Sequence, residues 1–246
     1  MKSKIIIILS FICLSLYPQA NRDLEKFNNA INLYSKKNYE ESLKIFLELR
    51  KSGIDNFEIN YNIGCTYTKL KKLGLARFYF ENALVFKPFD SDLFHNLKVV
   101  YNDILKDPLI GEQEIMNKRI IYFFPLSLLV ILFLICFLLS VLWIFLFFKL
   151  NNKKFFLIFF IIFIFFSFIF TLLFLLQYSE YNKKVFVVVE NTANVYIAPS
   201  SDETILVTLS EGTKGNVVNY VGDYIKINLA DGSSGWIKKD MVIYRE

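Results

Sequence analysis

The sequence has few of the side chains that catalysis and metal binding require. Its 246 residues include one histidine, His95, and three cysteines. A lone histidine cannot build a histidine-based metal cluster, and neither a phosphate-binding glycine loop nor an H-E-x-x-H helix is present. We therefore expect no enzyme activity, no metal and no cofactor.

The three cysteines do not favour a disulfide. Cys13 lies in an apolar N-terminal run, Cys136 lies in a long apolar segment, and Cys65 lies in the polar region between them. Cys13 is expected to be removed with the N-terminal run, and Cys65 and Cys136 would have to meet across two compartments, which they cannot. Cys65 is expected to be a small apolar residue of a helix, with a redox or partner-linking role as the alternative.

Two long segments, 120–148 and 155–177, contain no Asp, Glu, Lys or Arg. Each is long enough to cross a bilayer core of about 30 Å, so the lipid bilayer is an expected partner. A transporter or proton relay would place an ionisable group inside a span, and these segments carry none. They are expected to be plain transmembrane anchors.

The N-terminus has the layout of a secretory signal peptide, because Lys2 and Lys4 precede an apolar run that ends at Pro18-Gln19-Ala20. We expect residues 1–20 to be removed near Ala20, with an uncleaved anchor as the alternative. The short segment 149–154 carries three lysines and no acid. The positive-inside rule makes it a cytoplasmic loop and places both flanking regions on the exported, periplasmic side of a bacterial inner (cytoplasmic) membrane.

The formal net charge is +5, and it is not gathered into a basic stripe. A nucleic-acid-binding protein needs such a stripe and access to nucleic acid. Nucleic acid is therefore excluded as a partner.

Residues 57–90 carry small, aromatic and proline residues at regular spacing. Within a 34-residue unit, positions 7, 8, 11, 20, 24, 27 and 32 are Ile63, Gly64, Tyr67, Ala76, Phe80, Ala83 and Pro88. This spacing resembles a tetratricopeptide repeat, a pair of antiparallel helices that need small residues where they approach and a proline after the second helix. Residues 23–56 resemble a second repeat, and 91–106 a capping helix.

Three asparagines, Asn28, Asn62 and Asn96, recur at intervals of 34 residues. In tetratricopeptide arrays this position faces the concave groove, and a primary amide can both donate to and accept from the backbone of an extended peptide. The alternative is that asparagine is simply common there and binds nothing. The same register implies four further peptide-binding residues: Phe27, Tyr34, Tyr61 and Lys69.

Residues 185–246 change to short β-branched runs separated by turns. Seven strands are expected, and Asp231-Gly232 predicts a tight turn. The runs 194–200, 209–213 and 231–237 resemble a bacterial SH3-type domain. Such domains bind peptides or wall fragments, or dock on another protein. Tyr196 stands where the family usually has arginine, and Tyr224 stands where tryptophan is common. These two departures argue against a wall-peptide site of the family's usual kind.

The expected architecture is a multidomain membrane protein with an all-α tetratricopeptide array, a two-helix transmembrane hairpin and a small all-β SH3-like barrel. The array occupies 21–106 and the barrel 185–246, with linkers at 107–119 and 178–184. This domain order resembles the BatE-like proteins of bacterial aerotolerance operons. The resemblance implies partners among membrane proteins with von Willebrand A domains.

Two functions follow from these expectations. In the first, the protein is a membrane-anchored envelope adaptor or scaffold whose repeat groove binds a partner protein within a stress-tolerance complex. In the second, it is an envelope sensor or wall-attachment protein whose barrel binds peptidoglycan. The recurrence of Asn28, Asn62 and Asn96, which we call the asparagine ladder, favours the first function.

Overall fold

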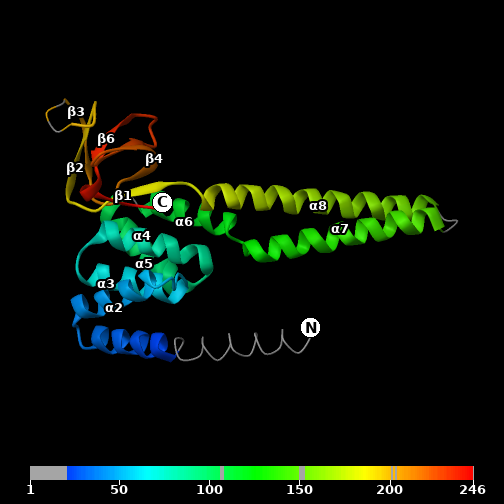
Figure 1. The fold of residues 1–246 in the computed structure, drawn as a ribbon, viewed down its shortest axis with the longest axis horizontal. Helices are drawn as coiled ribbons and strands as arrows, with labels where there is room; N and C mark the ends of the chain where they lie inside the picture. The colour runs from blue at the N-terminus through cyan, green and yellow to red at the C-terminus, as the bar shows by residue number, and fades with distance from the viewer. Residues whose placement is uncertain (1–20, 106–107, 150–152, 201, 203, 246) are drawn as a thin grey trace, which may run out of the picture.

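A computed structural model of the protein describes residues 21–105, 108–149, 153–200, 202 and 204–245. The predicted signal peptide and the centre of the predicted cytoplasmic loop, 150–152, lie outside the described residues. The chain forms a helical region, a pair of long apolar helices and a C-terminal antiparallel sheet (Figure 1).

The helical region begins with a helix over residues 21–35. It continues through α2 (Tyr39–Lys51), α3 (Phe57–Lys69), α4 (Leu73–Phe86) and α5 (Ser91–Leu105). Asparagine and aspartate side chains start α3 and α5: Asn56 accepts from Ile59 N and Asp90 from Leu93 N, both at 2.9 Å. The turns before α2 and α4 contain Lys37 (φ 65°) and Lys71 (φ 61°). The same left-handed turn conformation therefore recurs after 34 residues.

The helices of each pair pack through small residues at their contact. Ser42 on α2 donates its hydroxyl to the carbonyl oxygen of Ala30 at 2.8 Å, and both residues are fully buried. A Cβ atom at Gly64 on α3 would lie 2.6 Å from the ring of Phe80 on α4. Glycine is therefore required where α3 and α4 meet, as the repeat spacing predicts.

Most of the predicted linker 107–119 is instead helical. Helix α6 (Pro108–Ile121) packs on α5, where Lys98 Nζ lies 3.0 Å from Glu112 Oε2. Pro108 is the first residue of α6, a position at which the missing N–H of proline has no intrahelical partner to lose. A Cβ atom at Gly111 would lie 2.7 Å from Cβ of Tyr101. Pro108 and Gly111, from which the sequence predicts an end to the helical array, instead start helix α6 and permit its close packing on α5.

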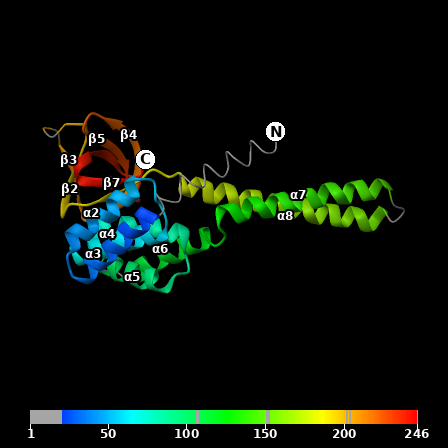
Figure 2. The same ribbon diagram turned by 60° about the horizontal axis from the view of Figure 1, so that its bottom comes forward.

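Helices α7 (Leu126–Lys149) and α8 (Lys153–Tyr181) lie side by side and project away from the rest of the protein (Figures 1 and 2). Both are long and apolar enough to cross a membrane. The first span was predicted to begin at 120, but the helix is broken between α6 and α7 at Tyr122–Pro125. Helix α8 extends through the first four residues of the predicted linker 178–184, so only three residues separate it from the sheet.

All seven predicted strands are present in the sheet, whose order is β3-β2-β6-β5-β4-β1-β7 with antiparallel pairing throughout. The turn at Asp231-Gly232 connects β5 to β6, and Asp231 accepts a hydrogen bond from Ser233 N at 2.9 Å. The strands are β1 (Val185–Val188), β2 (Thr192–Tyr196), β3 (Ile205–Ser210), β4 (Lys214–Val221), β5 (Tyr224–Asn228), β6 (Ser234–Lys238) and β7 (Val242–Tyr244).

Strand β1 is buried on both of its faces. Phe186 and Val188 lie in the core of the sheet, whereas Val187 packs into the core of the helical region. Successive side chains of a strand point to opposite faces, so β1 is shared between the two cores. The sheet therefore packs directly against the helical region beside α4.

Candidate functional site

The asparagine ladder lies on the first helix of each pair and on α5. Asn28 is exposed on the helix over 21–35. Asn62 donates to the carbonyl oxygen of Glu58 in its own helix at 2.7 Å, and Asn96 donates to the hydroxyl of Tyr61 at 2.8 Å. A primary amide has two N–H donors and an acceptor oxygen, so each side chain keeps capacity for a further partner.

Two of the predicted aromatic residues lie beside this ladder. Tyr61 stacks on Phe57 with ring centroids 5.4 Å apart, and Tyr34 meets Tyr39 edge-on at 5.3 Å. Burial raises the pKa of Tyr34 to about 12 and that of Cys65 to about 11. Cys65 is therefore a thiol at neutral pH rather than a thiolate nucleophile, which agrees with its expected structural role.

Phe27 and Lys69 make no hydrogen bond to the three asparagines among the interactions of the described residues. Phe27 packs edge-on against the buried ring of Phe46 at 5.7 Å and lines a separate apolar pocket of about 290 Å³ with Leu24 and Ile54. Lys69 is exposed at the last residue of α3. The structure thus brings Tyr61 and Asn96 into contact, whereas Phe27 faces the seam between helices.

A buried ion cluster, which no sequence pattern predicted, joins the helical region to the sheet. At its centre is Glu81 on α4, whose side chain is only 8% exposed. Its carboxylate pairs with Arg77 at 2.9 Å, with Lys214 on β4 at 3.4 Å and with Lys118 on α6, and it accepts from the hydroxyl of Tyr101 at 2.7 Å. Four elements, α4, α5, α6 and β4, meet at this one carboxylate.

Arg77 extends the cluster to the sheet. Its guanidinium donates to the carbonyl oxygen of Gly212 at 2.8 Å and to Glu114 on α6 at 2.8 Å. On the same side of α4, the backbone N–H of Gly74 donates to the carboxylate of Glu211 at 2.7 Å. These contacts hold the loop before β4 against the start and middle of α4.

The charges within the cluster outweigh the cost of burial for Glu81 and Lys214, whereas burial lowers the pKa of Lys118 to about 8. Burial alone raises the pKa of Glu81, but Lys118, Lys214 and Arg77 outweigh it and hold the pKa well below the usual 4.5. Burial likewise lowers the pKa of Lys214, but Glu81 and Glu114 outweigh it and raise the pKa above 10.5. Both groups therefore stay ionised at neutral pH.

One local signal could have pointed to the cluster. Arg77 and Glu81 form an i,i+4 pair in a helix whose other residues are almost all apolar or small. A charged pair on such a helix cannot easily reach water, so it needs partners from elsewhere in the fold.

The outer face of the sheet carries a second candidate surface. Tyr196 on β2 is paired with Trp236 on β6, and its ring lies 6.2 Å from that of Tyr224 on β5. The ammonium group of Lys226 lies 6.0 Å from the Trp236 ring. These four half-exposed residues form an aromatic and cationic face, and it includes both positions at which the sequence departs from the SH3 pattern.

Comparison with known proteins supports the assignment of the C-terminal sheet. No curated protein matches the chain. One solved structure with some likeness is that of a NlpC/P60 family protein from Bacillus cereus, with 20% identity and a TM-score of 0.23. The match covers 28% of this chain and 22% of that protein, and a score this low supports no functional comparison. Residues 189–242 match the family described as Bacterial SH3 domain, so the C-terminal sheet is a bacterial SH3 domain.

Proposed function

We propose that this protein is a membrane-anchored adaptor of the cell envelope, in which a tetratricopeptide-type helical region binds an extended segment of a partner protein. The observation that carries the proposal is the buried ion cluster around Glu81, which joins the helical region and the SH3 domain into one body. A fixed relation between two modules suits a scaffold that holds two partners together. A tether would instead use a long mobile linker.

The repeat character of the helical region supports a peptide-binding role. The left-handed turns at Lys37 and Lys71 and the small buried residues Ala30 and Gly64 recur at 34-residue intervals. Arrays of this kind present a concave surface to their partners. The lysine-rich connection between α7 and α8 favours a periplasmic position for this surface. The resemblance to BatE-like proteins suggests von Willebrand A domain proteins as the partners, in an aerotolerance complex.

The test is crosslinking in living cells followed by affinity capture, with wild type compared with Asn28→Ala/Asn62→Ala/Asn96→Ala. Each lost amide contact is worth about 1 kcal/mol, so the triple variant should bind its partner roughly 100-fold more weakly. Captured membrane protein should fall accordingly at equal abundance of the bait. The control is Asn29→Ala, an exposed asparagine beside Asn28 and outside the ladder register. Equal capture by wild type and triple variant would contradict a role of the ladder.

A second candidate function is binding of cell-wall peptides or glycans, which bacterial SH3 domains often perform. The observation that favours it is the exposed aromatic face at Tyr196, Tyr224 and Trp236, because aromatic rings with a neighbouring cation offer a large contact area to a ligand. In this case the helical region would hold the domain in place rather than bind a partner.

Sedimentation of the full-length protein with purified peptidoglycan tests this second function. If the aromatic face is the site, Trp236→Ala should weaken binding by about tenfold, the loss expected for one aromatic contact. Val218→Ala, an exposed position on β4, serves as the control. Retention of full binding by Trp236→Ala would exclude the aromatic face.

A further inference from the structure

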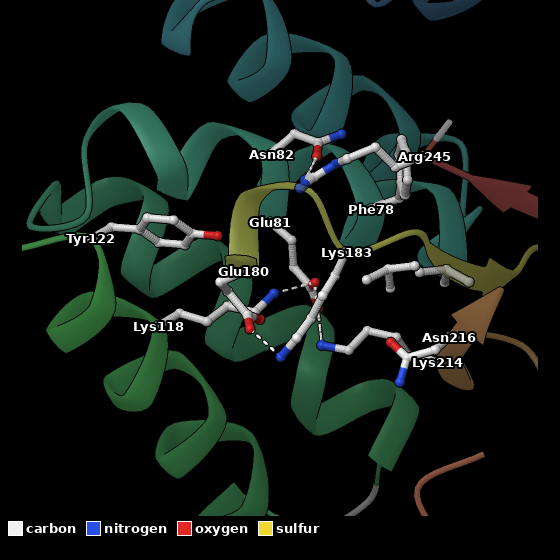
Figure 3. Close-up of a pocket in the computed structure, with 12 residues that line it drawn as sticks. Phe78, Glu81, Asn82, Lys118, Tyr122, Glu180, Lys183, Lys214, Asn216 and Arg245 are labelled. Carbon is white, nitrogen blue, oxygen red and sulfur yellow. Dashed lines mark hydrogen bonds and ion pairs between the residues drawn. The ribbon is translucent and has the colours of Figure 1, made fainter. Parts of the chain in front are cut away.

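A cavity of about 200 Å³ lies where the helical region, the end of α8 and the SH3 domain meet (Figure 3). We call it the junction cavity. Four cationic side chains and two carboxylates line it, which leaves an excess of two positive charges: Lys118, Lys183, Lys214 and Arg245 against Glu81 and Glu180. The volume exceeds that of several water molecules, each of which occupies about 30 Å³.

The cations differ in how their charge is balanced. Lys118 and Lys214 pair with Glu81, and Lys183 pairs with Glu180. Arg245, by contrast, has no carboxylate partner within the described part of the chain, and its guanidinium lies over the ring of Tyr181 at 5.8 Å. It donates to the carbonyl oxygen of Tyr181 at 3.3 Å and to the side-chain oxygen of Asn82. A guanidinium fork of this kind matches the oxygens of a phosphate or carboxylate.

Asn82, which accepts a hydrogen bond from Arg245, also holds a buried donor beside the cavity. The residue is 6% exposed, and its Nδ2 donor has no hydrogen-bond partner among the described residues. A buried donor without a partner is costly, so such groups usually have a ligand or water. Asn82 and Arg245 also line an adjoining cavity of about 160 Å³ with Arg50, whose Nε pairs with the carboxylate of Asp55 at 3.6 Å.

The position of the junction cavity limits the source of the ligand. Its lining includes Tyr122, which lies four residues before α7, and Glu180 near the last residue of α8. The cavity is therefore at the ends of the two apolar helices that are long enough to span a membrane. Lipid headgroups lie at this level when such helices are in a bilayer, and basic pockets at helix ends suit anionic headgroups.

We propose that the junction cavity binds a phosphate group, and that the headgroup of an anionic phospholipid supplies it. The phosphate oxygens accept from the guanidinium of Arg245, which Asn82 holds in place, and Lys183 adds a cation at the half-exposed rim. The junction cavity is separate from the repeat groove and from the aromatic face of the SH3 domain. A bound headgroup would fasten the SH3 domain, α4 and the end of α8 together at the membrane surface.

Native mass spectrometry of the full chain in neutral detergent tests the proposal, with phosphatidylglycerol, phosphatidylcholine and inorganic phosphate as separate probes. Wild type should retain one phosphatidylglycerol at least tenfold more tightly than phosphatidylcholine. Lys183→Gln and Arg245→Gln should each weaken retention by about tenfold, the loss of one charge-assisted contact. The Lys183 side chain is 50% exposed, so its variant should fold normally. The control is Lys154→Gln, an exposed lysine at the opposite end of α8.

The outcomes separate the two sources of phosphate. Retention of phosphatidylglycerol that both variants lose supports the site and the lipid. Binding of inorganic phosphate that both variants lose, without preference between the lipids, supports the phosphate site and overturns the lipid as its source. Equal retention of all probes, or binding by both variants at the wild-type level, overturns the proposal.

Discussion

Replacing Glu81 with glutamine is expected to lower the free energy of unfolding by about 3–5 kcal/mol, the usual cost of removing one partner from a buried ion pair. Glutamine keeps the shape of the side chain but removes the only carboxylate that pairs with Lys118 within the described part of the chain. It also leaves Arg77 and Lys214 with Glu114 alone. Urea unfolding of the full chain in neutral detergent, followed by circular dichroism, measures the change.

An exposed ion pair provides the control for this measurement. Glu58 pairs with Lys87 at 2.7 Å, and both side chains are about half exposed. Exposed pairs contribute less than about 1 kcal/mol, so Glu58→Gln should change stability little. Similar losses for Glu58→Gln and Glu81→Gln would mean that the buried cluster has no special role in holding the domains together.

The Glu81 carboxylate also gives this effect a pH dependence. Its pKa in the folded protein is well below 4.5, the ordinary value that it regains on unfolding. Its contribution to stability is therefore fully present above about pH 4.5 and is lost as the pH falls through the folded pKa. The difference in stability between wild type and Glu81→Gln should accordingly shrink as the solution becomes more acidic than pH 4.5.

Gly74→Ala is expected to loosen the contact between the SH3 domain and α4 while leaving the helical region folded. A Cβ atom at Gly74 would lie 2.3 Å from the backbone oxygen of Val188, which cannot move aside as a flexible side chain could. Overpacking of this kind costs about 1–3 kcal/mol at the contact. Within the helix itself, alanine in place of glycine stabilises by up to about 1 kcal/mol. The added methyl group therefore destabilises the contact with the SH3 domain and stabilises helix α4 itself.

Hydrogen exchange separates the two effects. In Gly74→Ala the amides at the contact, such as Gly212 N, which donates to Val188 O at 2.8 Å, should lose protection. Amides in the middle of α3 and α4 should keep it. Lys72→Ala is the matched control, because Lys72 is exposed and its side chain makes no capping hydrogen bond. Unchanged protection at Gly212 in Gly74→Ala would show that the domains tolerate the added methyl group.

The elements that the sequence predicted are those with a local signal. The seven strands alternate or form short apolar runs, and Asp231-Gly232 marks one turn by its own chemistry. The unbroken run Val185–Val189 corresponds to β1, whose two faces both need apolar residues because one contacts each core. The small residue at Gly64 follows from the close contact with Phe80.

The elements that were missed depend on partners distant in the chain. Pro108 and Gly111 act as helix breakers in most contexts, and their helical role becomes clear only when Tyr101 is packed against α6. Glu81 and Lys214 are 133 positions apart, and Asn82 and Arg245 are 163 apart. Charges so separated have no spacing pattern that could pair them before the fold is known. The cluster at the junction could therefore not be predicted. The 34-residue register, by contrast, predicted Tyr61 and Asn96 on one surface, and the structure shows a hydrogen bond between them.

The short connection between α8 and β1 determines how far from the membrane the SH3 domain can act. Only Asn182, Lys183 and Lys184 separate the two elements, and three extended residues cover at most about 10 Å. If α8 crosses the bilayer, the start of the SH3 domain stays within about 10 Å of the membrane end of this helix. It cannot extend outward to a distant wall layer, so any molecule that it binds must itself come to the membrane.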